Sequence, residues 1–184
     1  MNPKFRGRSI SIYYNHNKIA RFESEFTYRQ IHKAVEKFIR ADIPILAVIY
    51  GMPGSGKTFL AHLLSEQLLH CMILERDTMY AIGNNCTANK KVIQDDTFSR
   101  EFFAYICDVF LKSLRCNLII PSNTEKQLET ILKYDGYDKL VVSFDRITID
   151  ESVKCGIHKL DKPSTIEIYG EWKTYEEILN QGEM

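Results

Sequence analysis

Apolar and polar residues follow two patterns in the first part of the chain, an alternation typical of strands and then a spacing typical of a helix. Apolar and polar positions alternate over Ile10–Tyr14 and again over 18–22, on either side of an Asn-His-Asn turn, and this pattern predicts a β-hairpin. Apolar residues then recur at helical spacing behind Thr27 and Gln30, which have the spacing of a capping box. Residues 1–43 are therefore expected to form an N-terminal extension made of a small β-hairpin and a helix.

Between residues 44 and 184, short continuous apolar runs alternate with amphipathic segments. Such runs are typical of strands buried on both faces, and apolar residues that recur every three or four positions predict helices. The predicted strands are Ile45–Tyr50, Cys71–Leu74, Leu118–Ile120 and Leu140–Phe144. The predicted inner helix positions are Phe59, Leu60, Leu63, Leu64 and Leu68, then Phe98, Phe102, Ile106, Val109 and Phe110 within about 98–114, then Leu128, Ile131 and Leu132 behind a Thr124–Gln127 cap. This order predicts an α/β domain at 44–184 whose parallel sheet carries helices on both faces, with the carboxyl ends of its strands at one edge.

The first buried strand leads directly into Gly51–Thr58, whose sequence GMPGSGKT matches the phosphate-loop pattern G-x-x-x-x-G-K-[ST] in full. Glycines let backbone N–H groups turn toward an anion, and the helix that follows presents its positive end to the same phosphates. Lys57 is expected to reach the β- and γ-phosphates, and the Thr58 hydroxyl to bind Mg²⁺. The residues expected to bind ATP or GTP are Gly51, Gly54, Ser55, Gly56, Lys57 and Thr58.

Composition narrows the choice of partners. Lys and Arg together number 24, as do Asp and Glu, so no overall basic field attracts nucleic acid and any such contact needs a local basic patch. The five cysteines include no Cys-x-x-Cys pair, and neither a signal peptide nor a membrane-spanning run is visible. A cytoplasmic protein with reduced thiols and no membrane partner is the expectation.

The segments after the other strands distinguish among proteins with a phosphate loop. GTPases read guanine through Asn-Lys-x-Asp, whereas the last strand here leads into Ser143–Arg146, and a large ATPase would need more chain and an acidic residue after its third strand. The stretch from Ile45 to Trp172 resembles the P-loop kinases of the polynucleotide-kinase and zeta-toxin group. It does so through the phosphate loop and through Glu75-Arg76-Asp77-Thr78, Ile119–Thr124, Phe144-Asp145 and Lys162-Pro163.

This resemblance implies a P-loop NTPase fold of the kinase type and a role for each matching residue. Asp77 corresponds to the general base for the attacking hydroxyl, and its place after the strand beside the loop suits that role. Arg76, Ser122 and Asn123 are the candidates for binding the acceptor, and Arg146, Lys154 and His158 are the candidate lid residues that contact the transferred phosphoryl group. Three features depart from the family. Ser122, or Pro121 on an alternative register, stands where an aspartate is frequent, and Tyr80 stands where polynucleotide kinases can have a second arginine for the substrate phosphate. Lysines also replace most of the lid arginines, which removes bidentate contacts.

The function predicted from the sequence is transfer of the γ-phosphoryl group of ATP or GTP, with Mg²⁺, to a hydroxyl. The favoured acceptor is the 5′-hydroxyl end of RNA or DNA. A zeta-toxin-like or small-molecule kinase and a nucleotide-binding module without transfer activity are the alternatives. Neither the oligomeric state nor the role of residues 1–43 follows from the sequence.

Overall fold

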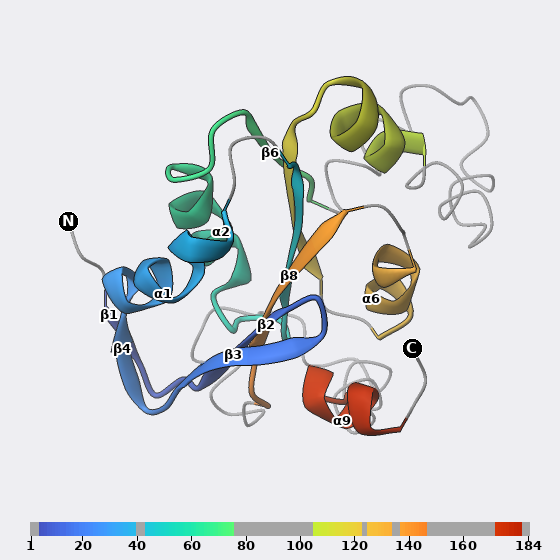
Figure 1. The fold of residues 1–184 in the computed structure, drawn as a ribbon. Coiled ribbons are helices and arrows are strands. Elements are labelled where there is room, and N and C mark those ends of the chain that lie inside the picture. The colour runs from blue at the N-terminus through green and yellow to red at the C-terminus, as the bar shows by residue number, and fades with distance from the viewer. Residues whose placement is uncertain are drawn as a thin grey trace, which may run out of the picture.

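A computed structural model describes residues 4–39, 43–75, 105–122, 125–133, 137–146 and 172–181. Its centre is a six-stranded sheet in the order β3-β2-β8-β5-β7-β6 (Figure 1). The strands are β2 (Ile10–Tyr14), β3 (Asn17–Phe22), β5 (Ile45–Tyr50), β6 (Cys71–Ile73), β7 (Asn117–Ser122) and β8 (Asp138–Phe144). The strands β8, β5, β7 and β6 are parallel to one another, and β2 and β3 are antiparallel to their neighbours.

The sheet is therefore mixed, which corrects the expectation of a parallel sheet with a hairpin added outside it. The predicted hairpin exists, and its turn residues Asn15 and His16 both have positive φ, as a two-residue hairpin turn requires. However, β2 pairs with β8 over its whole length, from Ile10 opposite Phe144 to Tyr14 opposite Leu140. This pairing satisfies the backbone groups of β8 that would otherwise form an exposed edge.

A second, two-stranded sheet joins β1 (Lys4–Arg6) to β4 (Glu25–Thr27). Its strands have only three residues each, too few to show an alternation in the sequence. The rings of Phe5 and Phe26 stack across it with their centroids 5.0 Å apart. This sheet fixes the start of α1 (Tyr28–Val35), where the predicted capping box of Thr27 and Gln30 is confirmed.

Helices cover both faces of the central sheet, as predicted. On one face α1 and α2 (Lys57–Ser65) pack against apolar side chains of β2, β5 and β8. On the other face lie α6 (Glu125–Leu132), α9 (Tyr175–Asn180) and the π-helical segment η2 (Asp108–Ser113). Figure 1 shows α1 and α2 on one side of the sheet and α6 on the other.

Most of the predicted inner positions among the described residues are confirmed, and the prediction for Phe59 is wrong. Leu60, Leu64 and Leu68 are buried, but Phe59 is 52% exposed. In the segment before β7 the fully buried residues are Cys107 and Leu111, while the predicted Ile106 and Phe110 are partly buried and pack against the same core cluster. The segment includes a π-helical turn, in which the N–H of Leu114 donates to the carbonyl of Val109 at 3.0 Å.

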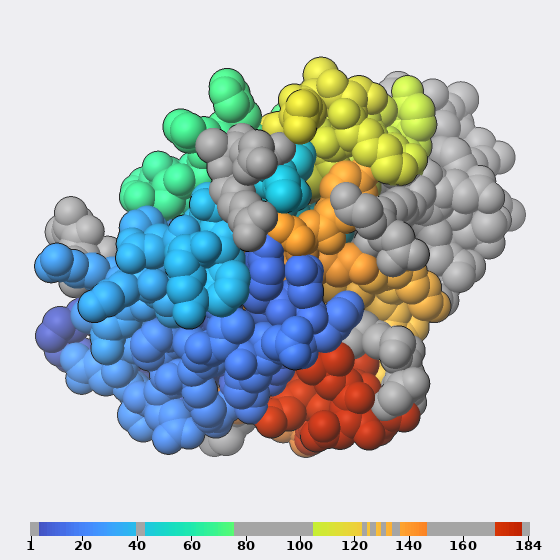
Figure 2. Space-filling model, in the orientation of Figure 1, coloured from blue at the N-terminus to red at the C-terminus, as the bar shows by residue number. Residues whose placement is uncertain are grey.

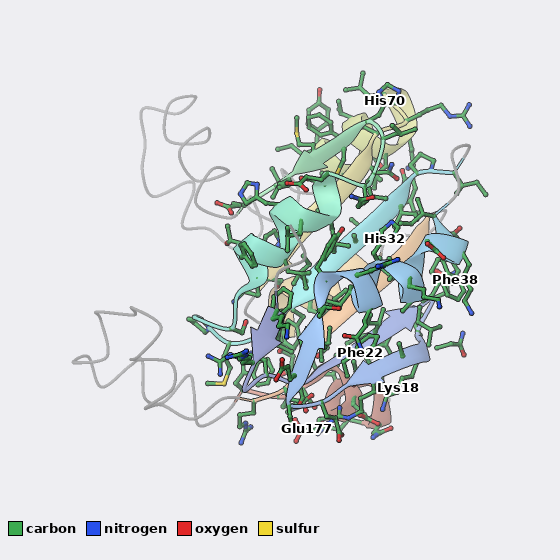
Figure 3. The ribbon with its side chains drawn as sticks, turned by 90° about the vertical axis from the view of Figure 1, so that its left-hand side faces the viewer. Lys18, Phe22, His32, Phe38, His70 and Glu177 are labelled. Atoms are coloured by element: carbon green, nitrogen blue, oxygen red, sulfur yellow. The ribbon has the colours of Figure 1, made fainter. Side chains whose placement is uncertain are left out.

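The end of the chain packs beside its beginning. Helix α9 starts at a capping box of Thr174 and Glu177, and its Glu176 accepts a hydrogen bond from Lys18 of β3 at 2.6 Å. Figure 2 shows α9 next to the N-terminal strands on one surface, and Figure 3 shows Lys18 and Glu177 at the same end of the molecule. None of the helices in the described ranges is long and apolar enough to cross a membrane.

Candidate functional site

The candidate phosphate loop lies at the centre of the parallel part of the sheet. The predicted strand before it is confirmed as β5, which is buried at all six positions between β7 and β8, and α2 begins at Lys57. The connection that leaves β5 runs toward β6, and the connection that leaves β7 runs in the opposite direction toward β8. Open α/β sheets bind ligands where neighbouring connections diverge in this way, at the carboxyl ends of the strands.

The backbone of the loop requires glycine at three positions. Gly54 and Gly56 have φ angles of 77° and 99°, which other residues rarely adopt. A Cβ atom on Gly51 would lie 2.8 Å from the Ser55 Oγ and 2.9 Å from the Phe144 Cβ, so a side chain there would clash. The Gly51 N–H donates to the Ser122 carbonyl at 3.1 Å, which ties the start of the loop to the end of β7.

Ser55 presents a buried hydroxyl inside this loop. The residue is only 3% exposed, and its Oγ has no hydrogen-bond partner among the described residues. An unsatisfied buried hydroxyl costs about 1–3 kcal/mol, so native proteins rarely keep one unless a ligand or water completes it. An anion held by the loop would supply the missing acceptor, and the residues present therefore fit a phosphate group.

The side chain of Lys57 folds back across the loop. Its Nζ donates to the carbonyl of Met52 at 2.8 Å, and burial lowers its pKa to about 8. A phosphate oxygen is a stronger acceptor for an ammonium group than a neutral carbonyl, and its charge would raise this pKa again. The neighbouring Thr58 is exposed at the start of α2, where its hydroxyl is accessible to a nucleotide-bound cation.

The lowered pKa of Lys57 predicts how stability depends on pH in the absence of nucleotide. Its folded value of about 8 lies below the ordinary 10.5, so between these values the unfolded chain binds more protons and the free energy of unfolding rises with pH. Below pH 8 the destabilising contribution is fully present. We expect urea unfolding between about pH 7 and pH 10 to show the wild-type protein gaining stability relative to Lys57→Met. If the free energies of unfolding of the two proteins change with pH in parallel, the lowered pKa of Lys57 is contradicted.

Ser122 ends β7 next to the loop and is buried at 1% exposure. Its backbone carbonyl is the acceptor for Gly51 described above. Alternation along β7 places its side chain with that of Ile120, on the face covered by α6 and α9 rather than on the face of α2. The predicted acceptor-binding role of Ser122 stays a prediction, and the other predicted residues of this group, Arg76 and Asn123, lie outside the described residues.

The residues that follow β8 make contacts of their own. Asp145 accepts hydrogen bonds from Arg21 of β3 at 2.8 and 3.3 Å, and Arg146 donates to the backbone carbonyl of Trp172. Arg146 therefore anchors the chain where it returns to the sheet, and its predicted contact with a phosphoryl group stays a prediction. Asp77, Lys154 and His158, the other predicted catalytic residues, lie outside the described residues.

Two aromatic residues, Tyr50 and Trp172, connect the returning chain to the strand that carries the loop, and no sequence motif predicted this contact. The Tyr50 ring stacks on Trp172 with centroids 5.1 Å apart, and the Tyr50 hydroxyl donates to the Lys173 carbonyl at 2.8 Å. Tyr50 immediately precedes Gly51, so this contact couples the position of the loop to residues after 171. A tyrosine at the last position of a buried apolar strand is the signal that could have revealed it.

Comparisons with protein-family models, with curated proteins and with solved structures returned no match to this chain. The functional assignment therefore depends on the geometry of the site and on the sequence motifs.

Proposed function

We propose that this chain binds ATP or GTP with Mg²⁺ at Gly51–Thr58 and transfers the γ-phosphoryl group to a hydroxyl acceptor. The observation that carries the proposal is the buried Ser55 hydroxyl, which has no partner in the described part of the chain and lies in a loop that requires glycine, between a central parallel strand and α2. The N-terminus of a helix at such a loop is a site for anionic phosphate groups.

The residues of the loop have complementary tasks in this proposal. Backbone N–H groups of 51–56 and the Ser55 hydroxyl hold phosphate oxygens, and Lys57 exchanges the Met52 carbonyl for the β- and γ-phosphates. Within the described ranges no three His, Cys, Asp or Glu side chains are grouped to hold a metal ion. We expect Mg²⁺ to enter with the nucleotide on Thr58 and phosphate oxygens, where it supplies neutralisation of the phosphate charge.

The transfer step rests on the resemblance to polynucleotide kinases and zeta toxins. In this proposal Asp77 orients the acceptor hydroxyl and accepts its proton, while Arg146, Lys154 and His158 contact the transferred group. The direct test is a screen with γ-labelled ATP and GTP across RNA, DNA, nucleosides and sugar nucleotides. Labelled product in one acceptor class, which disappears with Lys57→Ala, supports the proposal. If no acceptor class becomes labelled, phosphoryl transfer is contradicted.

The favoured acceptor, the 5′-hydroxyl of RNA or DNA, predicts a dependence on salt. A single strand that gives up counterions on binding loses affinity with a slope of about −0.7 in log–log units per neutralised phosphate. We expect KM for a 5′-hydroxyl oligonucleotide to rise with salt while KM for a nucleoside stays nearly constant. If a nucleoside or a sugar is phosphorylated as efficiently as the oligonucleotide, the acceptor is a small molecule.

A nucleotide-binding module without transfer activity is the second candidate. It is favoured by the contacts after β8, because Asp145 is paired with Arg21 and Arg146 with the Trp172 carbonyl. The absence of an acidic residue at Ser122 favours it as well. Tight binding of a non-hydrolysable ATP analogue, together with no labelled product in the screen, would select this candidate.

A further inference from the structure

Glu75 lies at the edge of the sheet that carries the candidate phosphate loop. The ladder between β6 and β7 continues one residue beyond β6, because the Leu74 N–H donates to the Ile119 carbonyl at 2.8 Å. Ile73 is in register with Ile119, and the same register continued two residues past the end of β6 brings Glu75 level with Pro121, which is itself in register with Ile49 of β5. Glu75 is thus two strands away from the end of β5, at the height where the loop begins.

The alternation of side chains places Glu75 on the face of the sheet that α2 covers. Ile73 packs with the cluster that contains Leu60 and Leu64 of α2, and Leu74 packs with the cluster on the opposite face. The next residue therefore returns to the α2 face. Lys57 and Thr58 form the first turn of that helix, whereas the Ser122 side chain belongs to the opposite face.

The carboxylate of Glu75 is incompletely satisfied. Its Oε1 atom is buried and has no hydrogen-bond partner among the described residues. A buried carboxylate oxygen without a partner is costly, and proteins keep such groups paired with cations or use them for function. The group that completes this carboxylate is therefore expected to be cationic or a hydrogen-bond donor.

We propose that Glu75 is the acidic residue that supports the cation at the phosphate loop, in place of the one missing at Ser122. The inference rests on the proposed nucleotide binding. Two strand spacings separate β6 from β5 by about 10 Å, which favours a contact through the water shell of Mg²⁺ rather than a direct bond. Thr58 and the phosphates hold the ion, and Glu75 accepts hydrogen bonds from the waters on it.

The test measures how Mg²⁺ changes nucleotide affinity. A non-hydrolysable ATP analogue is titrated calorimetrically into the wild-type protein, Glu75→Gln and Glu66→Gln, with Mg²⁺ and with EDTA. Glu66 is an exposed glutamate at the end of α2 and serves as the matched control. Loss of a residue that orients a metal-bound group lowers metal affinity roughly 10–100-fold. We expect Mg²⁺ to increase the affinity of Glu75→Gln for the analogue much less than it increases that of the wild type. In EDTA the variant should bind the analogue at least as tightly as the wild type, because a negative charge has left the site.

A second measurement does not depend on nucleotide. Glu75→Gln removes the charge of a half-buried carboxylate whose Oε1 atom has no partner among the described residues, so its thermal midpoint should not fall below that of the Glu66→Gln control. If Mg²⁺ increases analogue affinity in Glu75→Gln as much as in the wild type, the inference about Glu75 is overturned, while the proposal of nucleotide binding stands. If Glu75→Gln lowers kcat but leaves the Mg²⁺ dependence of analogue binding unchanged, Glu75 acts on the acceptor instead. That result also overturns the inference. If the wild type binds the analogue in neither condition, the proposed function fails and this inference fails with it.

Discussion

Lys57→Ala is expected to abolish phosphoryl transfer and to weaken binding of a nucleoside triphosphate roughly 10–100-fold, which corresponds to the ~1.5–3 kcal/mol of a charge-assisted hydrogen bond. The reason is local. Lys57 is the first residue of α2, its Nζ already lies over the loop on the Met52 carbonyl, and nothing else in the first turn of α2 carries a positive charge. Calorimetry with a non-hydrolysable analogue measures the affinity, and the labelled-phosphate assay measures transfer.

Lys57→Met is the control that separates lost chemistry from lost folding. It keeps most of the side-chain volume and removes a cation whose pKa burial lowers to about 8. At neutral pH this variant should therefore be at least as stable as the wild type while binding nucleotide more weakly. Misfolding cannot produce that combination. Unchanged affinity and activity in a folded Lys57 variant would remove Lys57 from the site.

Asp77→Asn is expected to leave nucleotide affinity nearly intact and to lower kcat by about 10²–10⁴-fold, the usual contribution of a general base. The amide keeps the size of the carboxylate and part of its hydrogen bonding but cannot accept the proton of the acceptor. Single-turnover transfer under saturating nucleotide gives kcat, and the analogue titration gives the affinity.

Asp145→Asn is the matched control, because Asp145 also follows a parallel strand at this edge. Its carboxylate is held by Arg21, so the substitution should weaken the link between β3 and the end of β8 and change kcat little. A fall in kcat of less than about fivefold in Asp77→Asn would exclude Asp77 as the base. A large fall in Asp145→Asn would transfer the role to Asp145.

The elements that depend on local pattern could be predicted from the sequence. The strand Ile45–Tyr50 has the predicted limits, and the capping box at Thr27 is present, because a continuous apolar run and a cap each act within a few residues. The order of the strands in the sheet could not be predicted in the same way. The pairing of β2 with β8 depends on contacts between residues more than 120 positions apart, such as Tyr14 and Asp138, which are 124 positions apart in the chain. No period in the sequence encodes such pairing.

The same distinction holds for the candidate site. The phosphate loop is a continuous segment, so its residue types and its place between a strand and a helix could be predicted together. The burial of Ser55, the return of Trp172 onto Tyr50 and the position of Glu75 depend on how distant segments pack. In the segment before β7, the fully buried side chains are Cys107 and Leu111, which the spacing of apolar residues alone did not single out.

Equilibrium binding of nucleotides to the wild-type protein is the decisive experiment for a triphosphate site at Gly51–Thr58. We expect saturable binding of a non-hydrolysable ATP or GTP analogue, stronger with Mg²⁺, weaker as phosphates are removed and greatly reduced in Lys57→Ala. The thermal midpoint should rise with analogue concentration, because a ligand that binds the folded chain stabilises it by mass action. Absence of saturable binding, or equal binding of a nucleoside that carries no phosphate, would contradict the assignment of Gly51–Thr58 as a triphosphate site.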